Sequence, residues 1–129
     1  MRILRAYPLS QMEGYRHFIG MLKKHVDKFN RQDKIHLVGY NERFDNGFLR
    51  AWFELNGDAY FGSWFFADTI DVMVLASYDI MTKGHRPALE NFQLGTVASY
   101  YDIVVEGALH GATVDVEITK AIYRKITEK

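Results

Sequence analysis

The first third of the chain has apolar side chains at the spacing of a helix. They recur three or four residues apart, at Met12, Tyr15, Ile19, Leu22, Val26 and Phe29. This spacing predicts an amphipathic helix of about five turns that ends near Arg31. Ser10 and Glu13 have the spacing of a capping box, which predicts the start of the helix. A short strand is expected before it, at residues 2–7.

Two glycines lie inside the predicted helix, Gly14 and Gly20. Each weakens a helix by up to about 1 kcal/mol relative to alanine, so tertiary packing must hold this segment. Their small size would allow a sheet or a second helix to approach closely.

Apolar and polar residues alternate over much of residues 34–67, which predicts three antiparallel strands. The strands are expected at 34–44, 48–55 and 59–67, with turns at Asn46-Gly47 and Asn56-Gly57-Asp58. Asn-Gly favours a two-residue hairpin turn because both residues accept positive φ. In this register Arg43 and Arg50 face each other across the first hairpin, and the third strand is apolar on both faces.

The segment from Asp68 to Lys83 fits two structures. Its alternation of side chains is typical of a strand, whereas Asp68 is a good helix N-cap and Lys83-Gly84 is a good helix end. Signals at both ends favour the helix, and the strand remains the alternative. Residues 85–94, which include Pro87, are expected to form a connection or a short helical turn.

The last third of the chain predicts a long hairpin. Residues 96–107 and 112–126 would pair across a turn at His110-Gly111, which brings the two apolar faces together. The predicted order is β-α-β-β-β-α-β-β. We therefore expect an α+β fold with a mainly antiparallel sheet and a long amphipathic helix packed on one face, in a single domain over residues 1–129.

Composition narrows the class of protein. The chain has 129 residues, 48% of them hydrophobic and 25% charged, which is typical of one globular domain and not of a disordered chain. It has no cysteine, which excludes disulfides, a thiol nucleophile and thiolate metal sites. No apolar run approaches the roughly 20 residues of a membrane span, and no signal peptide is visible. These features predict a small, soluble, cytoplasmic protein.

Common catalytic and phosphate-binding motifs are missing. The chain contains no G-x-x-x-x-G-K-[ST], G-x-G-x-x-G, H-E-x-x-H or G-x-S-x-G sequence. The sequence therefore favours a protein that is not an enzyme, and predicts no cofactor.

Charge is unevenly distributed along the chain. Residues 1–34 carry eight Lys/Arg and three acids, a net charge of 8 − 3 = +5. Residues 68–117 carry two Lys/Arg and eight acids, a net charge of 2 − 8 = −6. The basic helix is a candidate surface for nucleic-acid phosphates, or for an acidic face of a second copy. The total net charge of zero makes a nucleic acid the less favoured partner. A protein partner or self-association is favoured, without a membrane.

Aromatic residues gather between positions 40 and 66, beside two arginines. Aromatic residues and arginine are enriched at protein interfaces and at base-stacking sites. The candidate residues for contact with a ligand or partner are Arg43, Arg50, Trp52, Phe61, Phe65, His85 and Arg86. The last two are included because they follow the segment that ends at Gly84, in a predicted connection.

Four carboxylates would lie on one face of the predicted terminal hairpin: Asp102, Glu106, Asp115 and Glu117. Grouped carboxylates suit Mg²⁺ or Ca²⁺, which makes these residues weak candidates for a metal site. A solvated face of the sheet is the more ordinary interpretation.

Three functional hypotheses follow. The leading one is a non-catalytic binding module of the inhibitor or accessory type, as in small proteins of mobile elements or phages, which acts by contact with another macromolecule and forms homo-oligomers. The alternative is a pocket protein for a small anionic or nucleotide-like ligand, with or without enzyme activity. The third is a metal-dependent hydrolase that uses the four carboxylates.

Overall fold

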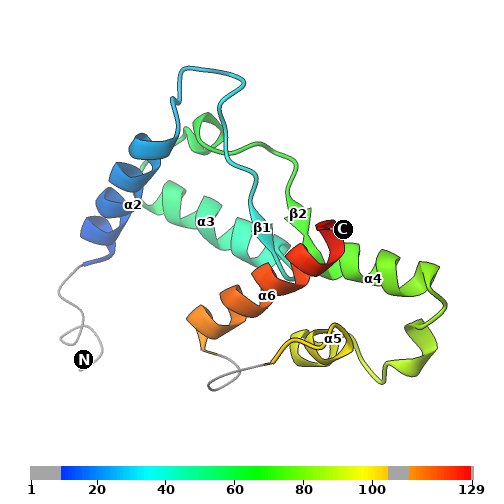
Figure 1. Cartoon of the computed structure of the whole chain (residues 1–129). Helices are drawn as coiled ribbons and strands as arrows, with labels where there is room; N and C mark the ends of the chain where they lie inside the picture. Colours follow the sequence, from blue (N-terminus) through cyan, green and yellow to red (C-terminus); the bar gives the residue numbers. More distant parts are fainter. Residues whose placement is uncertain (1–9, 105–110, 129) are drawn as a thin grey trace. The chain divides into compact units, whose positions relative to one another are not determined.

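The computed structural model describes residues 10–104 and 111–128, and these are mostly helical. The α-helices are α2 (Gln11–His25), α3 (Arg43–Leu55), α4 (Val72–Thr82), α5 (Leu94–Tyr100) and α6 (Ala112–Thr127), drawn in Figure 1. Two short strands, β1 (Val38–Gly39) and β2 (Ile70–Asp71), and two 3₁₀ turns, η1 (Phe61–Ser63) and η2 (Arg86–Ala88), complete the described elements. The predicted mainly antiparallel α+β fold is therefore wrong. The strand expected at residues 2–7 lies outside the described residues.

The described chain divides into two compact units by its contacts. The first contains residues 10–37 and 44–69, and the second contains residues 38–43, 70–104 and 111–128. Each unit has its own hydrophobic core. That the whole chain behaves as one domain stays a prediction.

Helix α2 begins where the sequence predicts. The Ser10 side chain accepts a hydrogen bond of 3.2 Å from the backbone N–H of Glu13, which confirms the predicted cap. The helix ends at His25 rather than near Arg31. Carboxylates end it early, because Asp27 accepts from the backbone N–H of Phe29 and so offers the chain an alternative to helical hydrogen bonds.

The core of the first unit is largely aromatic. Its buried residues are Leu22, Val26, Phe53, Phe61, Trp64 and Phe65. The Phe53 and Phe61 rings meet edge to face with their centroids 5.0 Å apart, and the Phe61 and Phe65 rings stack at 4.7 Å. Such ring pairs add about 0.5–1.5 kcal/mol each to the burial of apolar area.

Helix α3 replaces the predicted hairpin at Asn46-Gly47. A strand would place Leu49, Ala51 and Phe53 on one face, but Phe53 is buried and Leu49 half-buried while Ala51 is exposed. Leu49 and Phe53 are four residues apart, so a helix brings both to the core. Burial of Phe53 therefore overrides the local turn preference of Asn46-Gly47.

In the second unit, β1 pairs with β2 in parallel, with Val38 opposite Ile70. The Asp71 carboxylate caps α4, accepting 3.0 Å from the backbone N–H of Met73 and 2.9 Å from that of Asn41. The favoured helix within 68–83 is thus confirmed, with Asp71 as its cap instead of Asp68. The helix ends before Gly84, whose φ of 75° suits a glycine.

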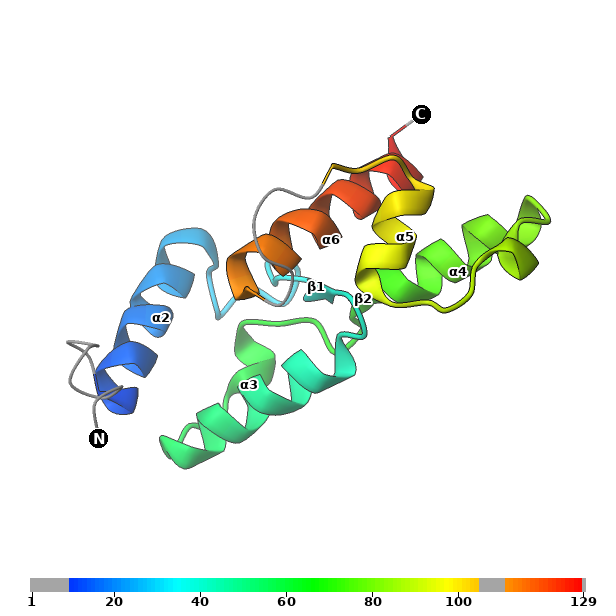
Figure 2. The same ribbon diagram turned by 90° about the horizontal axis from the view of Figure 1, so that it is seen from below.

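Helices α5 and α6 replace the predicted terminal hairpin. Ile118 and Ile122 of α6 are buried, whereas Val116, which a strand would place beside Ile118, is 64% exposed. Helix α6 packs against α4 and α5 (Figure 2). The core of this unit consists of Val72, Ala76, Ile80, Val97, Ala98, Tyr101, Ile118 and Ile122. The connection before α5 contains the short helical turn η2, which agrees with the prediction for residues 85–94.

Candidate functional site

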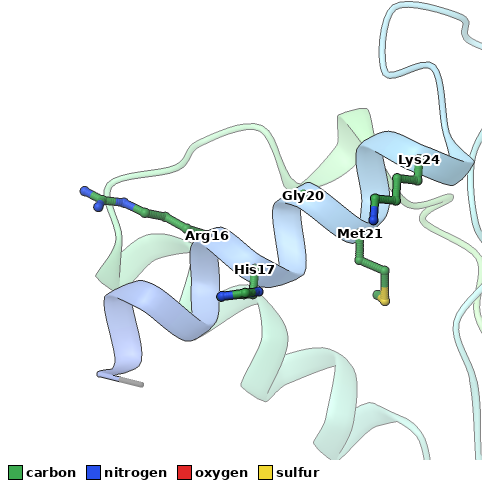
Figure 3. A pocket seen from close by; sticks show the side chains of 5 residues that line it. All are labelled: Arg16, His17, Gly20, Met21 and Lys24. Atoms are coloured by element: carbon green, nitrogen blue, oxygen red, sulfur yellow. The ribbon is translucent and has the colours of Figure 1, made fainter. Parts of the chain in front are cut away.

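The outer face of α2 has a shallow hollow of about 440 Å³. Five exposed residues of this one helix line it: Arg16, His17, Gly20, Met21 and Lys24. Figure 3 shows Arg16 and Lys24 on either side of Gly20. The opposite side of the helix packs into the aromatic core through Leu22, so this face points away from the core.

Gly20 lines the hollow and contributes no side chain to it. A Cβ atom at this position would meet nothing within 4 Å, so no described segment needs the glycine for close packing. A Cβ at Gly14, by comparison, would lie 3.9 Å from the Trp52 ring. The sequence-based suggestion that Gly20 admits a neighbouring element is wrong for the described residues. The glycine costs the helix stability without any visible packing benefit.

The cations beside Gly20 have no acidic partner among residues 10–104 and 111–128. The Arg16 guanidinium lies 3.5 Å from the Met12 sulfur, and neither Arg16 nor Lys24 forms a described ion pair. Lys34, by contrast, donates to the backbone carbonyls of Lys28 and Ser63. The charges of Arg16 and Lys24 therefore remain available to an external anion.

Helix α2 carries an excess of positive charge. Residues 11–25 contain Arg16, Lys23 and Lys24 against the single acid Glu13, a net charge of 3 − 1 = +2 with histidines neutral. Lys23 and Lys24 lie in the last turn, where the helix dipole favours cations. Arg16 lies outside that turn, so the dipole does not account for it.

All three predicted aromatic contact residues, Trp52, Phe61 and Phe65, belong to the first unit. Phe61 and Phe65 are buried. The Arg50 guanidinium lies over the Phe61 ring, 4.4 Å from its centroid, and Trp52 donates a hydrogen bond of 3.1 Å to the Gln11 side chain. Phe61 and Phe65 therefore belong to the core of this unit. Arg50 packs on that core, and Trp52 is held by Gln11.

The predicted opposition of Arg43 and Arg50 is wrong. The two residues lie seven positions apart on α3 and not across a hairpin. Their binding to an anion stays a prediction without support from this arrangement.

His85 and Arg86 lie in the connection that the sequence predicted for them, and each contacts an aromatic residue of the second unit. The His85 Nδ1 atom is 2.8 Å from the Tyr100 hydroxyl, and the Arg86 guanidinium lies 4.7 Å from the centroid of the Phe92 ring. These contacts fix the segment after α4. A role in ligand contact stays a prediction for both residues.

A hydrogen-bonded group joins the end of α4 to the residue after α5. The Asp79 carboxylate accepts 2.6 Å from the Tyr101 hydroxyl and 3.0 Å from the Lys83 ammonium group. Desolvation alone would raise the pKa of Asp79, but these two donors outweigh it and hold the pKa below its ordinary value. Asp79 is therefore held in its charged form, and the Lys83 ammonium group balances that charge.

The predicted cluster of four carboxylates depended on a hairpin that does not form. Asp115 and Glu117 lie on α6, two residues apart, where side chains do not face each other. Asp102 follows α5, and Glu106 lies outside the described residues. No group of three or more acids or histidines in the described ranges is arranged to hold a metal ion.

Comparison with known proteins identified no relative: no family model, no curated protein and no solved structure matches the chain. Among the helices described, none is both long and apolar enough to cross a membrane.

Proposed function

We propose that the chain is a non-catalytic binding module that contacts the phosphate backbone of a nucleic acid through the outer face of α2. The observation that carries this proposal is the pair of cations beside an open glycine. Arg16 and Lys24 flank Gly20, form no described ion pair, and lie on the solvent side of the helix.

The chemistry of the hollow matches a phosphate backbone. Arginine binds phosphate through two parallel hydrogen bonds, and lysine binds it as a point charge. Arg16 and Lys24 are eight residues apart, about 12 Å along the helix axis, so both side chains can reach phosphates of one strand. A glycine between them lets a phosphate approach the helix backbone, which a larger side chain would prevent.

Weak, sequence-independent binding is expected from so small a surface. If Arg16 and Lys24 neutralise two phosphates of duplex DNA, the slope of log K against log salt is about −1.8. Affinity then falls about tenfold between 50 and 200 mM salt.

The test is fluorescence anisotropy with a labelled DNA duplex of random sequence, over a range of salt concentrations. The double variant Arg16→Gln/Lys24→Gln should lose most of the affinity and of the salt dependence. The matched control is Lys120→Gln/Lys125→Gln, which removes the same charge from exposed positions of α6. This control should retain wild-type affinity within about a factor of two.

Two outcomes would contradict the proposal. If the wild type fails to bind the duplex at 50 mM salt, an acidic protein surface becomes the better partner for α2. If both double variants lose affinity equally, binding depends on total charge and not on the hollow.

A further inference from the structure

His17 is the one side chain lining the hollow on α2 whose charge can change near neutral pH. It lines the hollow together with Gly20, Met21 and Lys24, which follow it by three, four and seven residues. Residues at this spacing lie along one face of a helix. Figure 3 shows the His17 ring on the stretch of α2 between Arg16 and Met21. The imidazole therefore borders the space that the proposed function gives to a phosphate.

The His17 ring is not engaged by its own unit. Within the part of the chain that the structure describes, it makes no hydrogen bond, ion pair or ring contact. His36, by contrast, stacks on the Phe66 ring, and the His85 Nδ1 atom lies 2.8 Å from the Tyr100 hydroxyl. Both ring nitrogens of His17 are therefore available to an incoming anion.

The charged side chains around His17 belong to α2 itself, because no other described element lines the hollow. Arg16 and Lys24 are cations of the hollow, and Glu13, four residues before His17, forms no described ion pair. Nearby cations disfavour the charged form of an imidazole, and an anion placed among them favours it. Protonation of His17 and binding of a phosphate therefore favour each other.

We infer that proton uptake by His17 strengthens the phosphate contact, so that the chain binds nucleic acid more tightly as the pH falls below neutrality. This inference rests on the proposed function, because it adds a third cation to the pair formed by Arg16 and Lys24. Arginine and lysine keep their charge throughout this range of pH, whereas a histidine ordinarily gains its charge between pH 8 and pH 5. One residue of the hollow thus makes the contact sensitive to pH.

The size of the effect follows from the release of counterions. Two cations on two phosphates give a slope of log K against log salt of about −1.8, and a third cation makes it about −2.7. At 50 mM salt the additional phosphate contact raises affinity about tenfold. The affinity of the wild type should therefore rise about tenfold between pH 8 and pH 5.5, and its dependence on salt should become steeper.

The experiment is fluorescence anisotropy of the full chain with the random-sequence DNA duplex at pH 8 and pH 5.5, over a range of salt concentrations. His17→Gln should lose the rise in affinity at pH 5.5, because glutamine stays neutral. His17→Lys should bind at pH 8 about as tightly as the wild type binds at pH 5.5, because lysine is charged at both. The matched control is His25→Gln, which changes an exposed histidine of α2 that does not line the hollow. It should keep the full rise.

Circular dichroism at both pH values checks that each variant retains its helices. A wild type that binds with the same affinity at both pH values would overturn the inference and leave the contact through Arg16 and Lys24 standing. So would a rise in affinity that survives His17→Gln, or one that disappears in His25→Gln. A wild type that binds the duplex at neither pH would overturn the proposed function together with the inference.

Discussion

The substitution Gly20→Ala tests the premise that the hollow on α2 is not a packing device. Gly20 lies in the interior of α2, and a Cβ atom there would meet nothing within 4 Å. Its φ is not positive, so alanine fits the backbone without strain. The substitution should therefore stabilise the protein, because alanine loses less backbone entropy on folding than glycine.

The expected gain follows from helix propensity alone. Alanine in place of glycine within a helix is worth about 0.5–1 kcal/mol, with no steric term to subtract at this position. The matched control is Gly57→Ala in the same unit. A Cβ at Gly57 also meets open space, but its φ of 70° disfavours alanine. The free energy of unfolding of that variant should be about 1–2 kcal/mol lower than that of the wild type.

The assay is equilibrium unfolding in guanidinium chloride, followed by tryptophan fluorescence. Trp52 and Trp64 are the only tryptophans in the sequence, and both belong to the first unit, so their emission reports on the unit that contains both glycines. A Gly20→Ala variant that is less stable than the wild type by 1 kcal/mol or more would refute the reasoning. It would mean that an element packs against Gly20.

Other predictions concern stability. Ile122→Ala should lower the free energy of unfolding, measured by chemical denaturation, by about 2–5 kcal/mol, and Val116→Ala should lower it by less than about 0.5 kcal/mol. If this segment were a strand, the two losses would be similar. Asp71→Ala should cost about 1–2 kcal/mol, measured in the same way, because it removes the cap of α4. Since the pKa of Asp79 in the folded chain is lowered, its stabilisation is present above its ordinary pKa of 3.8 and is lost as the pH falls through the folded pKa. Tyr101→Phe should raise the Asp79 pKa in a carboxyl NMR titration, and an unchanged value would exclude their hydrogen bond as a cause.

Elements with local end signals were predictable from the sequence. The hydroxyl of Ser10 and the glycine at position 84 act at helix ends through bonds and backbone angles that depend on a few neighbouring residues. The start of α2 and the end of α4 were therefore predicted correctly. Asp71, and not Asp68, caps α4, and the Asp71 carboxylate also accepts a hydrogen bond from the backbone N–H of Asn41, which is distant in the sequence.

Helix α6 was predicted as a strand because its apolar spacing fits both structures. Val114, Ile118 and Ile122 recur every four residues, which is a multiple of the strand period and also close to one helical turn. A strand would also place Val116, Lys120 and Arg124 on the face of Ile118 and Ile122, whereas in the folded chain all three are exposed. The predicted terminal hairpin followed from this ambiguity, and so did the carboxylate cluster placed on it.

The candidate site was visible in the sequence only in part. The excess of basic residues over positions 1–34 indicated the right region. The lining of the hollow depends on which face of α2 is buried, and hence on the packing of Leu22 in the aromatic core. The role assigned to Gly20 was wrong because the sequence does not show whether a neighbour lies against it.

The most direct test of the proposed contact is an NMR titration of the ¹⁵N-labelled chain with a DNA duplex at 50 mM salt. We predict that the largest changes in amide shift occur at Gly20 and its neighbours on the outer face of α2, with those of α4 and α6 unchanged. Shifts that concentrate on α6, or an unchanged spectrum at saturating DNA, would contradict a nucleic-acid contact through α2.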